Sequence, residues 1–209
     1  MDKVNAAISE IKNGGAKATL SALQLDVTDE DSIKDAARAV DESHGRLDAL
    51  IKNAGVGCRV PDLKTRLTMC LTVNAIGSAL VSDAFRPLLL RSKAPYSVYV
   101  SSGGGSFERN LQPSANKLAF DEAYRISKAA QNMIAVREHM EYSARGIKVF
   151  VMSPGCVVSN LRGTSEEERN AWGAASDPDV TGDTILQIVP GERDADVGKF
   201  VVKDWLYPW

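Results

Sequence analysis

The chain has 209 residues, of which 44% are hydrophobic and 25% charged, and its net charge is −2. This balance is typical of folded soluble proteins, and the lack of a basic excess argues against nucleic acid or a membrane surface as a partner. The polar start is unlike a secretory signal, and no apolar run approaches the ~20 residues of a membrane span. The three cysteines are widely spaced, so we expect reduced thiols in a cytoplasmic protein. We also expect no metal site, and the length predicts one domain over residues 1–209.

Helical and strand patterns alternate along the chain. Apolar residues at helical spacing predict a helix over 2–11, and β-favouring residues predict a short strand over 22–27. Thr28 and Asp31 have the spacing of a capping box, which predicts a helix over 30–44 that ends at Gly45. The same alternation then predicts strand 47–51, helix 65–91 with a kink or break at Pro87, strand 96–101, helix 122–144, strand 147–152, helix 180–189 and strand 199–202.

Strands separated by helices predict an α/β fold, a Rossmann-like doubly wound parallel sheet. In such sheets ligands bind beyond the carboxyl ends of the strands. Polar clusters follow the predicted strands at those ends, at Asp26, Asn53–Gly55, Ser101–Gly105 and Pro154–Ser159. We therefore expect the functional site at this edge.

Tyr124 and Lys128 lie four residues apart, so they share one face of the predicted helix. A tyrosine titrates near pH ~10, and a neighbouring ammonium favours the phenolate and lowers that pKa. Such a tyrosine can exchange a proton with a substrate hydroxyl or carbonyl. A lone Tyr-x-x-x-Lys is also typical of an ordinary surface pair.

Two further segments follow predicted strands at the edge of the sheet where we expect the functional site. The strand at 96–101 is followed by serines and glycines, and a serine there can stabilise negative charge on a carbonyl oxygen. The strand at 47–51 is followed by Asn53-Ala54-Gly55. Both segments are also compatible with simple turns.

Together these residues resemble the short-chain dehydrogenase/reductase family over nearly the whole chain. Asn53–Gly55 resembles the family's Asn-Asn-Ala-Gly turn, with Lys52 in place of the first Asn, and Leu25–Thr28 resembles its adenine-contacting strand end. The other matches are Asn74 on the long helix, Ser102 with Tyr124 and Lys128, the segment Pro154–Ser159, and the ending with Gly198 and Pro208–Trp209, which is similar to the carbonyl-reductase-like branch.

The resemblance implies hydride transfer between NADP (alternatively NAD) and a small carbonyl or alcohol substrate. Tyr124 would be the general acid or base, Lys128 would lower its pKa and bind the ribose, and Ser102 would hold the substrate oxygen, with Ser101 the second choice. Asn74 would position a water, and the residues near 107–120 would form a loop over the substrate pocket. The implied cofactor-binding residues are Asp26, Val27, Asn53, Ala54, Gly55, Tyr124, Lys128, Pro154, Gly155, Val157 and Ser159.

The family's glycine-rich phosphate turn has no counterpart here. Gly55-Val-Gly57 lacks a third glycine, Gly103–Gly105 lies in the serine loop, and Gly14-Gly15 ends a helix. We therefore expect an N-terminally truncated member that lacks the family's first strand, first helix and second strand. The alternative to an oxidoreductase is a non-catalytic relative without cofactor binding, and the sequence leaves the substrate and the choice between monomer and homo-oligomer open.

Overall fold

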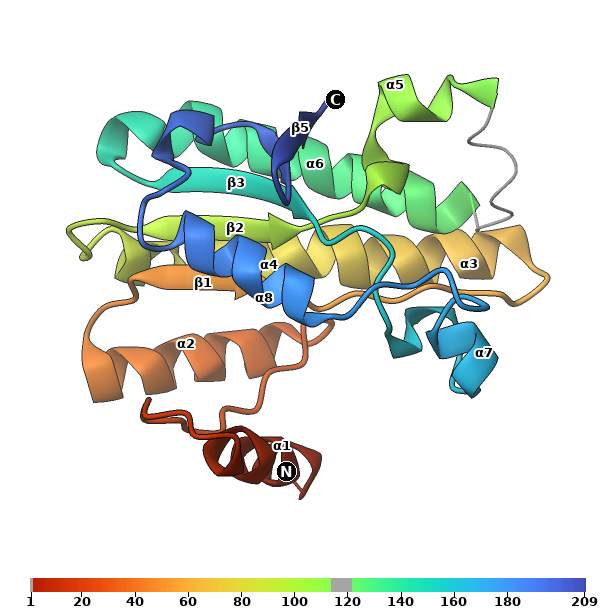
Figure 1. Cartoon of the computed structure of the whole chain (residues 1–209). Coiled ribbons are helices and arrows are strands. Elements are labelled where there is room, and N and C mark those ends of the chain that lie inside the picture. Colours follow the sequence, from red (N-terminus) through yellow and green to blue (C-terminus); the bar gives the residue numbers. More distant parts are fainter. Residues whose placement is uncertain (1, 114–121) are drawn as a thin grey trace.

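The computed structural model describes residues 2–113 and 122–209, and its strands form a single twisted sheet (Figure 1). Neighbouring strands follow chain order from β1 to β5, and the first four are parallel while β5 runs antiparallel to β4. The strands are β1 (Ala49–Lys52), β2 (Tyr96–Val100), β3 (Lys148–Ser153), β4 (Phe200–Val202) and β5 (Trp205–Tyr207). The predicted parallel α/β sheet is confirmed, whereas β5 was missed.

Two helices of the described chain precede β1, and the others lie between the strands. The helices are α1 (Asp2–Asn13), α2 (Glu30–His44), α3 (Leu63–Cys70), α4 (Ser78–Leu89), α5 (Phe107–Asn110), α6 (Glu122–Tyr142), α7 (Glu166–Arg169) and α8 (Asp179–Ile188). Part of the predicted loop at 107–120 forms α5, and its residues 114–120 lie outside the described residues.

Helices cover both faces of the sheet. On one face α4 and α6 pack against a cluster that includes Leu89, Tyr99 and Ala135. On the other face Ile188 of α8 packs against a cluster that includes Phe150. All five residues of β2 are buried, as expected for a parallel strand covered on both sides.

Helix α2 ends as predicted but begins with a different cap. Gly45 follows its last residue with φ 68°, a left-handed conformation that glycine adopts without steric cost. At the start, the Asp29 side chain accepts hydrogen bonds from the backbone of Asp31 and Ser32, so the cap is Asp29 and not the predicted Thr28. Its buried face packs on α4 through Ile33.

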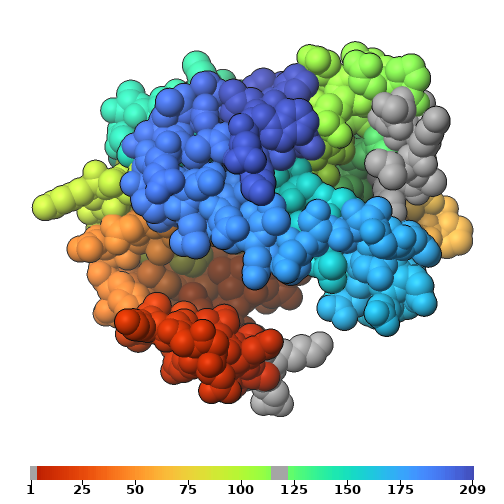
Figure 2. Space-filling view, viewed as in Figure 1, coloured from red at the N-terminus to blue at the C-terminus, as the bar shows by residue number. Residues whose placement is uncertain are grey.

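The predicted strand at 22–27 does not form. These residues belong to no helix or strand. An extended segment becomes a strand only when a neighbour supplies its hydrogen bonds, and none of the described strands lies beside this one. Helix α1, before it, is mostly exposed and lies at the periphery of the molecule (Figure 2).

The long helix predicted over 65–91 is interrupted, but not at Pro87. Leu71–Gly77 adopts a π-helical conformation between α3 and α4, and Pro87 lies inside α4. The run from Leu63 to Leu89 also has the length and composition of a membrane span, contrary to the expectation from the sequence. The buried face of this run packs against α2, α6 and the sheet, as a core helix does. Its length and composition are therefore weak support for a membrane span.

Gly77 is required where the π-helical segment meets the chain before α2. A Cβ at Gly77 would lie 2.6 Å from the carbonyl oxygen of Val27 and 3.0 Å from its Cβ. We expect Gly77→Ala to lower the free energy of unfolding by about 1–3 kcal/mol, because rigid backbone must shift. Gly182→Ala is the control, because no atom lies within 4 Å of its Cβ position in α8. Urea unfolding in which Gly77→Ala is as stable as the unsubstituted protein, or gains as much stability as Gly182→Ala, would contradict this prediction.

Candidate active site

The predicted pair Tyr124 and Lys128 lies on α6, at the end of the sheet where β2 finishes. The Lys128 ammonium lies 5.8 Å from the centroid of the Tyr124 ring. Ser102, two residues beyond β2, lies close enough to the Tyr124 hydroxyl to lower its pKa through hydrogen bonding. The three side chains that the sequence singled out are therefore brought together.

Lys128 is buried and held by two acceptors. Its Nζ donates to the carbonyl oxygen of Val100 at 2.9 Å and to Oε1 of Gln131 at 2.9 Å. Only 3% of the residue is exposed, and burial lowers the pKa of Lys128 to about 8. The cause is desolvation, which penalises the charged ammonium.

Tyr124 differs from the expectation drawn from the sequence. Burial raises the pKa of Tyr124, and this effect outweighs the hydrogen bond with Ser102 and the positive charge of Arg162, which both act to lower it. The predicted lowering of its pKa by Lys128 is therefore wrong for this structure. The hydroxyl is held in its neutral, proton-bearing form at neutral pH.

The two serines after β2 have different surroundings. Ser101 is buried and its Oγ donates to Oδ1 of Asn132 at 2.6 Å, which ties the end of β2 to α6. Ser102 is partly exposed, and its Oγ accepts from the backbone N–H of Gly104 at 3.1 Å. Ser102 lies beside Tyr124, whereas Ser101 is bonded to α6, and the role of Ser102 at a substrate oxygen stays a prediction.

Glycine brings this serine loop close to α6. A Cβ at Gly105 would lie 2.8 Å from the backbone carbon of Lys128 and 2.9 Å from Nδ2 of Asn132. Among the glycines at 103–105, considered from sequence as a phosphate turn and rejected, Gly105 therefore permits close packing between the loop and the helix.

Asn74 lies in the π-helical segment and is completely buried. Its Oδ1 accepts from the backbone N–H of Val56 at 2.8 Å, while its Nδ2 donates to the carbonyl oxygen of Val56 and to Oγ of Ser127, each at 2.9 Å. The side chain thus joins the loop after β1 to α6. The water that the resemblance assigns to Asn74 stays a prediction.

The loop after β1 lies open beside Lys128. Asn53, Ala54 and Gly55 are exposed. A Cβ at Gly55 would lie 3.5 Å from Nζ of Lys128 and 3.4 Å from Oδ1 of Asn74. This short approach leaves the ammonium facing an accessible backbone.

The remaining predicted cofactor residues lie in two segments, one before α2 and one after β3. Asp26 is exposed, and hydrogen bonds from the backbone and side chain of Thr28 hold its pKa below the usual range. Val27 contacts Gly77 in the π-helical segment. On the side that follows β3, the positions in question are Pro154, Gly155 with φ 77°, Val157, which bridges to Ser176, and Ser159, whose Oγ accepts from the backbone N–H of Leu161.

Arg162 is a neighbour that the sequence did not reveal. Its guanidinium donates to the carbonyl oxygens of Val157, Glu168 and Arg169 at 2.7–3.0 Å, so it clamps α7 onto the segment after β3. The available signal was a cationic residue three positions after Ser159, a predicted cofactor-binding residue.

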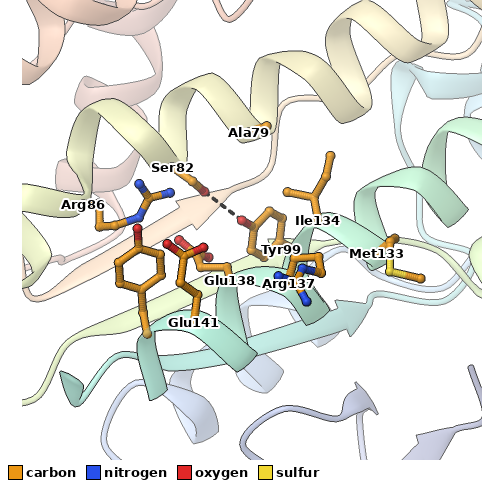
Figure 3. A pocket seen from close by; sticks show the side chains of 10 residues that line it. Ala79, Ser82, Arg86, Tyr99, Met133, Ile134, Arg137, Glu138 and Glu141 are labelled. Carbon is orange, nitrogen blue, oxygen red and sulfur yellow. Dashed lines mark hydrogen bonds between the residues drawn. The ribbon is translucent and has the colours of Figure 1, made fainter. Parts of the chain in front are cut away.

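A second polar cluster lies outside this centre, beside a cavity of about 240 Å³ between α4 and α6 (Figure 3). Lys52, at the position where the family's turn has Asn, lies 3.5 Å from the carboxylate of Glu138, and both side chains are 3% exposed. Ser97 hydrogen-bonds to both groups, and Lys52 also lies 3.5 Å from the centroid of the Tyr99 ring. Burial lowers the pKa of Lys52 to about 8. This cluster fastens β1 and β2 to α6.

The donor set fits the nicotinamide ribose half of a dinucleotide. The buried ammonium of Lys128 faces the open Gly55 loop. Within residues 2–113 and 122–209, no glycine-rich turn opens a helix of eight or more residues, so the pyrophosphate half has no comparable cradle there.

Comparison with known proteins agrees with this geometry. The family model for short chain dehydrogenase matches residues 1–170. The short-chain dehydrogenase/reductase tropE of Talaromyces stipitatus is 32% identical over 205 residues, covering 90% of this chain and 75% of the relative. Human 17-beta-hydroxysteroid dehydrogenase type 2 is 37% identical over 187 residues, covering 86% of this chain and 43% of the relative.

A solved structure shows the same fold. The NADPH-bound carbonyl reductase from chicken fatty liver superposes with a TM-score of 0.80 at 26% identity, covering 100% of this chain and 82% of that protein. The chain therefore belongs to the short-chain dehydrogenase/reductase family of NAD(P)-dependent oxidoreductases, as its motifs predicted.

The buried ammonium of Lys128 has a consequence for stability. Its pKa of about 8 lies below the ~10.4 of an unfolded lysine, so the unfolded state binds more protons between these values and stability rises with pH there. Below pH 8 the full cost of the buried charge applies. Lys128→Met removes this cost. We therefore expect the change in the free energy of unfolding caused by Lys128→Met to be more favourable at pH 7 than at pH 10.5 by about 2–3 kcal/mol.

Urea unfolding at both pH values measures this difference. Lys64→Met, which removes an exposed lysine, is the control and is expected to show no such dependence on pH. An equal effect of Lys128→Met at both pH values would refute the prediction.

Proposed function

We propose that the protein reduces the carbonyl group of a small molecule, with Tyr124 as the general acid. The observation that supports this assignment is the placement of Tyr124 beside Ser102 and near the buried ammonium of Lys128, because a protonated hydroxyl there can donate to a carbonyl oxygen as negative charge develops. Ser102 provides a second donor for the same oxygen. The substrate would therefore lie between Tyr124, Ser102 and the open end of the sheet.

A nicotinamide cofactor, when bound, supplies the hydride. Lys128 would hold its ribose from the Gly55 side, and Asn53, Ala54, Gly155, Val157 and Ser159 would line the nicotinamide. We assign NADPH over NADH because the related carbonyl reductase was solved with NADPH bound. Asp26 and Val27 would contact the adenine end, Asn74 would hold a relay water, and the protein would act in the cytoplasm.

The alternative is a relative that neither binds the cofactor nor catalyses. The lack of a glycine-rich phosphate turn in the described chain favours it. A titration with NADPH separates the two, since the alternative requires no binding at any concentration up to the millimolar range.

Tyr124→Phe tests the proposed chemistry. The substitution removes the hydroxyl and keeps the ring, so we expect carbonyl reduction to fall at least ~100-fold while NADPH affinity stays nearly unchanged. The measurements are the NADPH-dependent reduction of reactive aldehydes and ketones and a fluorescence titration with NADPH. Tyr142→Phe, at the far end of α6, is the control. Turnover of Tyr124→Phe within threefold of the unsubstituted protein would reject the assignment.

Lys128→Met tests the proposed ribose contact. One ammonium is proposed to serve both the tyrosine and the cofactor, so this variant is expected to lose activity and also to bind NADPH at least ~10-fold more weakly. Unchanged NADPH affinity would reject the ribose role while leaving the role of Tyr124 intact.

A further inference from the structure

Gln131 is a polar side chain buried where an apolar one would pack at lower cost. It is completely buried on α6, three residues after Lys128 and therefore on the same face of the helix. Its Nε2 has no hydrogen-bond partner in the described structure. An unpaired buried N–H group destabilises the fold, so another interaction of the Gln131 side chain must offset this cost.

The other end of the amide makes the informative contact. Oε1 of Gln131 accepts from Nζ of Lys128 at 2.9 Å, and the carbonyl oxygen of Val100 accepts a second proton at 2.9 Å. An ammonium has three N–H donors, so these two bonds leave the third for the open side, where the Gly55 loop lies. The amide is turned to keep its oxygen on Lys128, which leaves its nitrogen unpaired.

We propose that Gln131 is a positioning residue for Lys128, which holds the ammonium protonated and aims its remaining N–H at the cofactor side of the site. The inference rests on the proposed function, in which Lys128 acts beside Tyr124. An acceptor on the charged form favours protonation and so opposes burial, which already lowers the pKa of Lys128 to about 8.

Among the described residues, Gln131 supplies the side-chain acceptor that stabilises the Lys128 ammonium. Tyr124 lies on the same helix, with its ring centroid 5.8 Å from the ammonium, and Cys70 from α3 packs beside Tyr124. The neighbours from β2 and the loop after β1 are backbone groups, and the side chain near Gly55 is the uncharged Asn74. Among the residues that the structure describes, no carboxylate forms an ion pair with Lys128.

Direct titration of Lys128 tests the proposal without requiring catalysis. In the full chain with isotope-labelled lysine, the Nζ signal of Lys128 is identified by its loss in Lys128→Met and followed by NMR against pH. We expect Gln131→Met to lower the pKa of Lys128 by about one unit, a tenfold loss in proton affinity, and Gln131→Glu to raise it. Gln187→Met, on α8 at the opposite face of the sheet, is the matched control and leaves it unchanged.

A pKa of Lys128 in Gln131→Met that stays within about 0.3 unit of the unsubstituted protein overturns the proposal. If that variant does not fold, Gln131→Glu decides, and an unchanged pKa there has the same meaning. In the active holoenzyme, the alkaline limb of carbonyl reduction in Gln131→Met is expected to move to lower pH by the same amount. Absence of carbonyl reduction in the unsubstituted protein would reject the proposed function, whereas the NMR result would separately report on the contact between Gln131 and Lys128.

Discussion

The arrangement of the site depends on one amide group, the side chain of Asn74. Its oxygen and nitrogen both bond to the backbone of Val56, and the nitrogen also reaches Ser127 on α6. Ser127 in turn donates to the carbonyl oxygen of Tyr124. Three segments distant in sequence, the loop after β1, the π-helical turn and α6, are thereby fixed relative to one another. The short approach of Gly55 to Lys128 follows from this attachment.

Burial then sets the electrostatics of the centre. The same desolvation disfavours a phenolate at Tyr124 and an ammonium at Lys128, so it raises the pKa of Tyr124 and lowers the pKa of Lys128. A site of this kind reduces the stability of the fold at neutral pH, since no carboxylate among the described residues forms an ion pair with the charged Lys128. Such a cost is expected where a residue is retained for chemistry rather than for packing.

Local pattern predicted much of the fold and the central pair of the site. Helix α2, the buried strand β2 and the shared face of Tyr124 and Lys128 follow from periodicity and a glycine end signal, which depend on neighbours in sequence. The failures depend on partners distant in sequence. The segment 22–27 has the composition of a strand but no neighbour, and the direction of the Tyr124 pKa shift depends on burial by several elements. The role inferred for Gln131 required knowing which of its two amide atoms meets Lys128.

The number of residues in the π-helical segment Leu71–Gly77 determines the direction in which Asn74 points. A π-helical turn holds more residues than an α-helical turn, so it places Asn74 at an angle that a regular helix would not give. Each residue of an α-helix turns the chain by about 100°. Loss of a single residue from this segment would therefore permit a regular helix from α3 to α4 while rotating Asn74 away from Val56. Among relatives, a one-residue deletion at this place would uncouple the loop after β1 from α6 and leave every other motif of the sequence intact.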